Sequence, residues 1–209
     1  MSGTMKSKSG WLTTLLLIAA TSLVLAQQNV GGGQAKKWII SKNSSLSVNG
    51  TTNVNKFSCA VPNYDQVDTL TLSKSKTDNG IILSGSVTLS INAFDCHNSG
   101  MTSQLRKTLN EKQFPVLRIK FLSLNKMPVL NAKAEAITGL VEIKIAGVSK
   151  RFEVNYQITQ TDQKNIRLLG SRYVNFSDFN LVPPSKLGGM IKARDQLSVD
   201  FQLNMTVMN

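Results

Sequence analysis

The segment from Phe94 to Phe121 constrains the fold most strongly, because an alternating apolar pattern stops there, becomes helical and then resumes. Met101, Leu105 and Leu109 recur at intervals of four residues, which places them on one face of a short helix. Across residues 117–121, apolar positions alternate with basic ones, which is typical of a strand with one buried face. The sequence therefore predicts a short helix inserted between strands and covering part of a sheet.

Both ends of this helix carry signals that are typical of helix termini. Asn98 begins an Asn-Ser-Gly cluster that can cap the first turn. Arg106, Lys107 and Lys112 fall in the later part, where positive charge suits the negative end of the helix dipole. Pro115 blocks continuation of the helix, because proline has no backbone N–H and clashes with the preceding turn.

The rest of the chain has the period-two pattern of strands separated by turn signals. Asn49-Gly50 and Asn79-Gly80 predict turns, Ala146-Gly147 predicts a hairpin, and Ser177-Asp178 ahead of Phe179 predicts a capped turn. The predicted strands cover residues 38–48, 57–61, 70–72, 81–91, 117–121, 141–145, 152–158, 166–176 and 197–207.

Three of these segments carry details about packing. Residues 38–40 open the folded part of the chain, and we expect them at the edge of the core. Phe57, Cys59 and Val61 share one strand face, which points the Cys59 side chain inward if that face meets the core. Gly85 interrupts the apolar face of its strand, where glycine often allows a bend or the close approach of another group.

The pattern predicts an all-β fold of about eight or nine strands with one short inserted helix. An antiparallel meander of that number removes its exposed edges by closing into an extended β-barrel, and eight strands enclose either packed side chains or one ligand. A β-sandwich is the alternative architecture. The helix favours the barrel, because it can plug or flank one end.

The first residues differ in composition from the rest. Lys6 and Lys8 precede an apolar run from Trp11 to Leu25, and small residues ending at Ala26 suit a cleavage site. We interpret residues 1–26 as a secretory signal peptide rather than a membrane anchor, because the run is shorter than the roughly 20 residues that span a bilayer. Residues 27–37 are Gly-rich and polar, which predicts a flexible leader, and residues 38–209 form the folded domain. The expected location is periplasmic or secreted.

The chain is strongly basic, with a net charge of +12. Removal of residues 1–26 leaves 22 basic and 12 acidic residues, a net charge of +10. The basic residues are spread along the chain and often fall on predicted exposed strand faces, which favours a solvated surface over a dedicated polyanion site. Export makes nucleic acid an unexpected partner, while contact with a membrane surface stays open.

Cys59 and Cys96 are the only cysteines, and His97 is the only histidine. In an exported protein two cysteines without Cys-x-x-Cys spacing favour a disulfide between them. Two thiols and one imidazole leave a zinc shell incomplete, so we expect no metal and no cofactor. Without a nucleophile motif or phosphate-binding loop, catalysis would rest on scattered residues such as Asp95, His97 and Asp178, and we expect no enzyme.

Three segments in order, QFPVLRIKF (113–121), ITGLVEIKIAGVSKRFEV (137–154) and FSDFNLVPP (176–184), resemble the YceI-like family. The likeness extends from Trp38 to Val207, with Phe57 in an early strand. The resemblance implies an extended lipocalin-like antiparallel barrel in an exported protein, whose apolar interior holds a long isoprenoid or related lipid. It implies binding rather than catalysis. The chain departs from many relatives at residues 95–98, where it has a cysteine, and in a short link between its first strands.

Patterning alone allows the apolar strand faces to line a tunnel or to meet in a packed core. The resemblance favours a ligand-binding tunnel, with the helix stripe as a possible cover. The residues then expected to bind the ligand are Leu83, Val87, Leu89, Leu117, Ile119, Phe121, Ile143, Tyr156 and Phe201. Tyr156, Asn98, Ser177 and Asp178 are candidates for the polar mouth. The alternative function is a basic envelope-surface module with a packed interior that binds anionic lipid heads or glycans.

Overall fold

The structure is a computed structural model that describes residue 3 and residues 35–75 and 80–208. The predicted signal peptide, most of the predicted leader and the predicted turn at Asn79-Gly80 involve residues outside those ranges. The folded part begins with a strand at Lys36. Among the described residues, no helix is long and apolar enough to cross a membrane.

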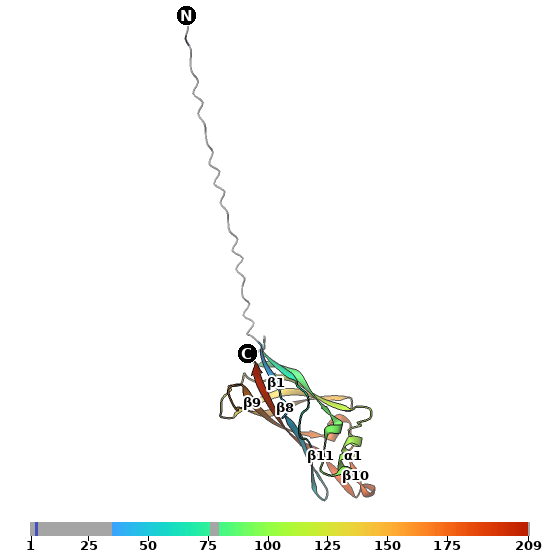
Figure 1. The fold of residues 1–209 in the computed structure, drawn as a ribbon. Helices are drawn as coiled ribbons and strands as arrows, with labels where there is room; N and C mark the ends of the chain where they lie inside the picture. The colour runs from blue at the N-terminus through green and yellow to red at the C-terminus, as the bar shows by residue number, and fades with distance from the viewer. Residues whose placement is uncertain (1–2, 4–34, 76–79, 209) are drawn as a thin grey trace. The chain divides into compact units, whose positions relative to one another are not determined.

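The described residues form eleven strands, one α-helix and three short 3-10 helices (Figure 1). The strands are β1 (Lys36–Ile40), β2 (Ser45–Thr52), β3 (Lys56–Val61), β4 (Thr69–Lys74), β5 (Ile81–Ser90), β6 (Val116–Leu124), β7 (Glu135–Ile145), β8 (Val148–Gln160), β9 (Asn165–Asn175), β10 (Ser185–Lys186) and β11 (Ile191–Met208). The helices are η1 (Ile91–Ala93), α1 (Ser99–Thr108), η2 (Phe176–Phe179) and η3 (Leu187–Gly189).

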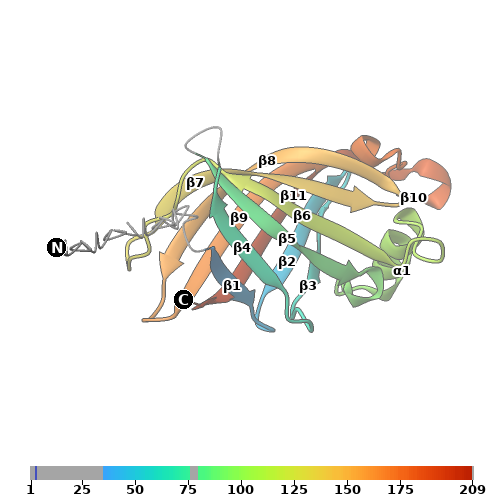
Figure 2. The same ribbon diagram turned by 90° about the horizontal axis from the view of Figure 1, so that it is seen from above.

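Eight antiparallel strands close into a barrel (Figure 2). The order around the ring is β1-β4-β5-β6-β7-β8-β9-β11, and β1 closes it by pairing with β4 on one side and β11 on the other. Ala146 and Gly147 both have positive φ in the two-residue turn between β7 and β8, as the predicted hairpin requires. The predicted all-β barrel is confirmed.

The β2–β3 hairpin and β10 are not among these eight strands, but the hairpin continues the barrel wall beside the first part of β11, which β1 does not reach. β11 is long enough to pair with β2 along its first part and with β1 along its last part. The predicted single strand over residues 38–48 is therefore two strands, β1 and β2, which pair with different stretches of β11. This split, together with the two-residue β10, raises the strand number above the eight or nine that we expected.

The predicted turn at Asn49-Gly50 is wrong, because both residues lie inside β2. Gly50 pairs with Phe57 on β3, and a Cβ atom at Gly50 would lie 2.3 Å from the Phe57 ring. The glycine makes room for this aromatic side chain. The chain turns later, where the Thr52 hydroxyl accepts hydrogen bonds from the N–H groups of Val54 (3.1 Å) and Asn55 (2.9 Å).

The position expected for residues 38–40 is also wrong, because Trp38 and Ile40 lie inside the core while Ile39 is half-buried. Trp38 is 2% exposed and Ile40 is 0% exposed. β1 has neighbouring strands on both sides, so its inward side chains contact the barrel interior rather than an edge. Gly85 behaves as predicted: its φ is +147°, the register shifts beside it, and a Cβ atom there would lie 2.6 Å from the Thr69 carbonyl oxygen.

The predicted helix is confirmed as α1, which lies at one end of the barrel (Figure 2). The Asn98 side chain caps it by accepting a hydrogen bond from the Met101 N–H at 2.9 Å. Leu105 and Leu109 are buried in the main hydrophobic core, and Met101 packs against it. Pro115 does not set the helix end, because α1 ends at Thr108 and the chain reverses through Asn110, which has φ of 54°.

Candidate functional site

An apolar cavity of about 30 Å³ lies inside the barrel. Its walls come from β2, β3, β5, β6 and β11, from Ser44 just before β2 and from Tyr64 just after β3. The lining residues are Ser44, Ser45, Leu46, Val61, Tyr64, Val87, Leu89, Ile119, Phe121, Phe201 and Leu203. Five of the predicted ligand-binding residues are among them: Val87, Leu89, Ile119, Phe121 and Phe201.

The other four predicted residues lie elsewhere in the barrel. Leu83 and Leu117 are buried in the same core, and Ile143 is partly buried against it. Tyr156 is fully buried, and its ring meets that of Phe201 edge to face with centroids 5.9 Å apart. The structure thus brings the nine residues into one interior but brings only some of them to the cavity.

The remaining lining residues were not predicted. Leu46, Val61 and Leu203 lie on alternating strand faces, so the strand pattern contained a signal for them. Ser44 and Tyr64 come from connecting segments, where no periodicity indicates which side chains turn inward. Ser44 is buried, and the hydrogen bond that its hydroxyl accepts from the Asn204 N–H at 3.0 Å offsets the cost of burying this polar group.

The cavity of about 30 Å³ is far too small for a long hydrocarbon chain. The interior is therefore packed, and a long hydrocarbon chain needs side chains or strands to move before it fits. Interiors at this density respond to insertion by shifting side chains and backbone, which costs roughly 1–3 kcal/mol for small additions. Entry of a ligand therefore depends on where the barrel wall lacks hydrogen bonds between strands.

The wall is weakest between β3 and β5. β5 pairs with β6 up to Ser90 but with β4 only up to Ser84, so the edge of residues 85–90 has no strand partner among the described residues. Tyr64 occupies this position: it lines the cavity, and its hydroxyl accepts a hydrogen bond from the Thr88 N–H at 3.4 Å. The hydroxyl donates in turn to the Asp68 carboxylate. Tyr64 therefore lies at the gap in the barrel wall and is hydrogen-bonded to the unpaired edge of β5.

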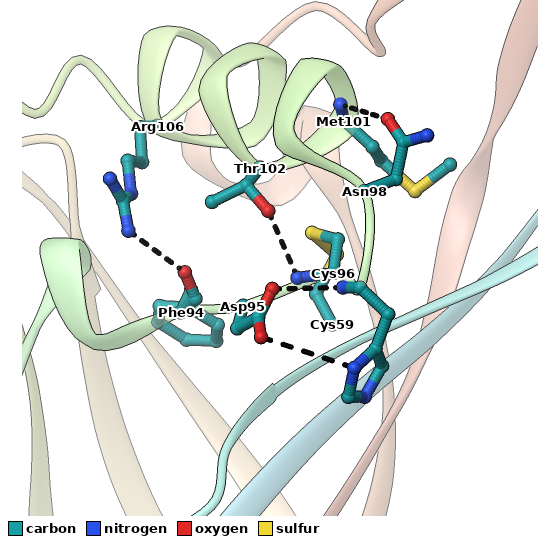
Figure 3. The surroundings of a disulfide bond; sticks show 9 residues. Cys59, Phe94, Asp95, Cys96, Asn98, Met101, Thr102 and Arg106 are labelled. Atoms are coloured by element: carbon teal, nitrogen blue, oxygen red, sulfur yellow. Dashed lines mark hydrogen bonds and ion pairs between the residues drawn. A yellow bond between two sulfur atoms is a disulfide. The ribbon is translucent and has the colours of Figure 1, made fainter.

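The predicted disulfide between Cys59 and Cys96 is confirmed (Figure 3). Cys59 is on β3, and Cys96 lies in the segment between η1 and α1. Ala60 and Asp95 exchange backbone hydrogen bonds of 2.7 and 2.8 Å next to the disulfide. The covalent bond and this bridge attach β3 to the segment that follows β5.

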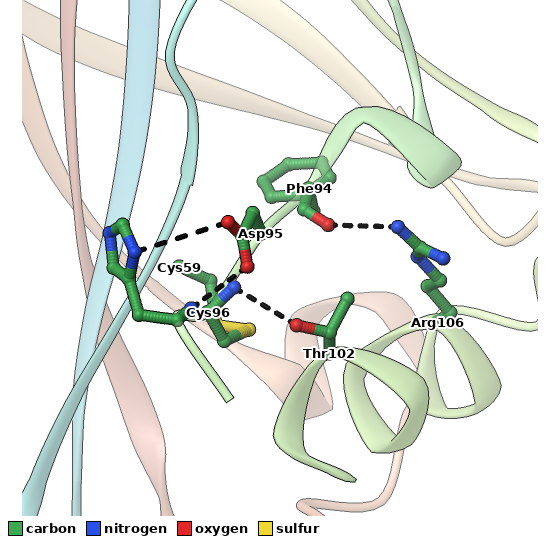
Figure 4. A network of polar contacts seen from close by, with 7 residues as sticks. Cys59, Phe94, Asp95, Cys96, Thr102 and Arg106 are labelled. Atoms are coloured by element: carbon green, nitrogen blue, oxygen red, sulfur yellow. Dashed lines mark hydrogen bonds and ion pairs between the residues drawn. A yellow bond between two sulfur atoms is a disulfide. The ribbon is translucent and has the colours of Figure 1, made fainter. Parts of the chain in front are cut away.

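The same segment is attached to α1 on its other side (Figure 4). The buried Thr102 hydroxyl accepts a hydrogen bond from the Cys96 N–H at 3.0 Å. The Arg106 guanidinium donates to the carbonyl oxygens of Asn92 (2.6 Å) and Phe94 (3.1 Å). Arg106 therefore holds the helix against the barrel end, a role beyond the dipole interaction inferred from its position.

The polar residues proposed for a mouth have local structural partners. Asn98 caps α1, Ser177 donates to Asp195, and Asp178 accepts from the Asn175 N–H in a capping box that confirms the predicted turn. Tyr156 lies deep inside the barrel instead. Asp95 accepts a hydrogen bond from the exposed His97 N–H at 2.9 Å, which shapes the loop before α1.

Tyr156 is the residue of the interior whose chemistry stands out. Its hydroxyl is buried and has no hydrogen-bond partner, a property shared among the described residues only by Trp38 Nε1 and Arg106 Nε. Burial raises the pKa of the Tyr156 phenol above its ordinary value of 10.0. Burial also raises the pKa of Tyr64, and the hydrogen bond with Asp68 adds a smaller increase.

These shifts predict a fall in stability at alkaline pH. The unfolded chain loses the phenol proton near pH 10 while the folded protein keeps it, so stability is complete below that pH and decreases above it. For Tyr156 the slope is about 1.4 kcal/mol per pH unit until the pH reaches the raised pKa. We expect Tyr156→Phe to remove this share of the slope in urea unfolding between about pH 9 and pH 11. An unchanged slope would contradict the assignment.

A second, open depression of about 910 Å³ lies on the outer face of the sheet. Its exposed or half-buried lining residues alternate along the strands with buried ones, which places them on the outer face. They include Ser47, Asn155, Ser171 and Asp200. Its lining also includes inward-facing residues of the same strands, among them the predicted ligand-binding residues Tyr156 and Phe201.

A closed eight-stranded antiparallel barrel with an apolar interior and a helix at one end defines the class of this protein. The model of the YceI-like domain matches residues 37–205, and the chain belongs to this family. No curated protein matches the sequence significantly.

Solved structures share the fold at low sequence identity. BcnA of Burkholderia cenocepacia is 14% identical with a TM-score of 0.57, covering 77% of this chain and 95% of that protein. A polyisoprenoid binding domain from Saccharophagus degradans, implicated in plant cell wall breakdown, is 10% identical with a TM-score of 0.56, covering 82% of this chain and 98% of that domain. At these low identities the TM-scores show a shared fold and nothing further.

Proposed function

We propose that the protein binds a long apolar lipid, a polyisoprenoid or a similar chain, inside its barrel and acts as a carrier or store without catalysis. The observation that carries the proposal is the apolar cavity beside a gap in strand pairing, at which Tyr64 lies. The YceI-like family and the similar fold of the polyisoprenoid binding domain from Saccharophagus degradans support the same role. The disulfide is compatible with an exported protein, as a periplasmic or secreted carrier requires.

The energetics favour a long ligand. Burial contributes about 0.8 kcal/mol per methylene, so one five-carbon isoprene unit contributes roughly 3 to 4 kcal/mol. Association costs about 4 to 15 kcal/mol, and micromolar affinity needs a net gain of about 8 kcal/mol. Several units must therefore be buried together. The barrel must also expand, because the cavity of about 30 Å³ is far smaller than such a chain.

Tyr156 does not line the cavity, but a ligand that expands the interior toward it would meet its unpartnered hydroxyl. A buried hydroxyl without a partner is unfavourable by about 1 to 3 kcal/mol. A ligand oxygen that accepts its hydrogen bond would remove this cost, whereas a pure hydrocarbon would not. The preferred ligand is therefore a long apolar chain with an oxygen-bearing end group placed inside the barrel.

The direct test is lipid extraction and native mass spectrometry of protein purified from its own cells. We expect a bound species whose mass fits a long apolar chain and which stays bound in high salt, because burial in an enclosed apolar site does not depend on ionic strength. If the wild-type protein has no extractable lipid and binds no polyprenyl or fatty-chain probe, the proposal fails. The alternative of a basic surface module for anionic lipid heads or glycans would then be favoured.

A filling variant locates the site within the barrel. Val87 lines the cavity, so Val87→Phe should occupy the space that a ligand must enter and weaken binding of a fluorescent polyprenyl probe by about tenfold or more. Val154→Phe is the matched control, because Val154 is as deeply buried in the same core but does not line the cavity. Equal loss of binding in both variants would contradict a site centred on this cavity.

A further inference from the structure

The three most exposed large apolar side chains of the described residues lie close together in the sequence. Val182 is 79% exposed, Met190 is 74% exposed and Leu187 is 70% exposed. They lie in the segment that contains β10 and η3, at the end of the barrel where α1 also lies (Figure 2). Val54, in the turn between β2 and β3, is also strongly exposed. We call Val54, Val182, Leu187 and Met190 the apolar tip.

Hydrogen bonds hold the two turns of the apolar tip side by side. The Asn53 side chain donates to the Met190 carbonyl at 2.8 Å and accepts from the Lys192 N–H at 3.0 Å. The Asn53 N–H donates to the Lys192 carbonyl at 3.2 Å. The turn that carries Val54 is therefore fixed against the segment that carries Met190.

Leu187 has a backbone conformation that its side chain disfavours. Its φ is 52°, and the next two residues, Gly188 and Gly189, also have positive φ. A leucine at positive φ is strained, and an exposed leucine gains no packing energy in return. The leucine at this position therefore does not serve folding, which points to a role in binding.

The surroundings of the apolar tip are basic. Residues 182–194 include Lys186, Lys192 and Arg194 and no acidic residue, and residues 49–58 include Lys56 and no acidic residue. All four basic side chains are exposed, and none takes part in an ion pair within the part of the chain that the structure describes. Exposed apolar side chains close in sequence to exposed basic ones fit the interface of an anionic membrane.

We propose that the apolar tip docks the protein on the surface of an anionic lipid bilayer. Val182, Leu187 and Met190 enter the interface, while Lys56, Lys186 and Lys192 contact the anionic head groups. This docking goes beyond the proposed barrel function and does not require it, because it uses side chains outside the barrel interior. The surface covers the same end of the barrel as α1 and the disulfide-linked segment.

The test is co-sedimentation with vesicles of phosphatidylcholine alone and of phosphatidylcholine with a quarter phosphatidylglycerol. We expect the wild-type protein to bind the anionic vesicles about tenfold or more tightly than the neutral ones, with binding that weakens as salt is added. The double variant Leu187→Gly with Met190→Ser should lose about tenfold or more in affinity for anionic vesicles. Replacing Lys186 and Lys192 with glutamine should weaken binding and reduce its salt dependence.

Two controls separate docking from folding and from the barrel site. Leu187→Gly should not lower the thermal unfolding midpoint, because glycine accepts the positive φ without strain. Val129→Ser should bind vesicles like the wild-type protein, because Val129 is 61% exposed at the far end of β6 from α1. The tip variants should also keep the wild-type affinity for a polyprenyl probe in detergent.

Three outcomes would overturn the proposal: wild-type protein that binds neither vesicle, tip variants that bind as tightly as the wild-type protein, or a Val129→Ser variant that loses as much binding as the tip variants. Self-association through the tip, detected by sedimentation as a dimer without vesicle binding, would also overturn it. Failure of docking with normal probe binding would leave the barrel function intact.

Discussion

Removal of the disulfide is expected to lower the free energy of unfolding by about 4 kcal/mol. Cys59 and Cys96 are 37 residues apart, and in the chain-entropy model a bond closing a loop of this length restricts the unfolded chain by that amount. Urea unfolding with and without reductant measures the effect in the wild-type protein. The variant with both cysteines replaced by alanine should be insensitive to reductant, which controls for effects of the reductant itself.

The same change should also speed exchange of ligand. The disulfide attaches β3 to the segment after β5, so its loss removes the covalent restraint on the wall gap next to Tyr64. Stopped-flow transfer of a polyprenyl probe should be several times faster in the reduced protein under conditions where it stays folded. Unchanged stability would contradict the loop-closure argument, whereas unchanged exchange with reduced stability would place the entry route elsewhere.

The strands and the helix were predictable because their signals are local and repetitive. The alternation on β5 and β11 follows from burial of one sheet face, and the stripe at Met101, Leu105 and Leu109 follows from helical spacing. The pairing of Cys59 with Cys96 was predictable because there are only two cysteines. These features depend on spacing within a segment or on the residue inventory.

The errors arose where distant segments decide the structure. Gly50 has the sequence signature of a turn but lies in a strand, because the Phe57 ring on the next strand needs the space of its missing side chain. Trp38 and Ile40 lie in the core because β1 closes the ring between two strands from distant parts of the chain. No pattern within a single segment indicates either relation.

The candidate site was predictable as an interior but not as a cavity. Period-two alternation shows which side chains face inward, and the nine predicted residues are all buried or partly buried in the main core. It does not show where packing is incomplete. Tyr64 lies at the wall gap and is hydrogen-bonded to Thr88 and Asp68, and its connecting segment has no repeating pattern. The cavity and its access route needed the three-dimensional arrangement.

Replacing Phe121 with alanine is expected to lower the free energy of unfolding by about 3 to 5 kcal/mol, because it removes a fully buried aromatic ring. Phe121 lines the interior cavity, so the new space adjoins the existing cavity and enlarges the proposed ligand site. Phe94→Ala is the matched control. Phe94 is equally buried in the same core but does not line the cavity, so the loss of stability should be similar.

Addition of a long-chain apolar ligand should separate the two variants. A ligand that binds only the folded state stabilises it by about 2.7 kcal/mol at a concentration one hundred times its dissociation constant. In Phe121→Ala the ligand can fill the enlarged site, so the thermal midpoint should rise more than in the wild-type protein, whereas Phe94→Ala should gain no more than the wild-type protein does. Because both variants lose the same side chain, unequal rescue would result from the position of the space rather than from lower stability. Equal rescue of both variants, or rescue of neither, would contradict ligand binding at this cavity.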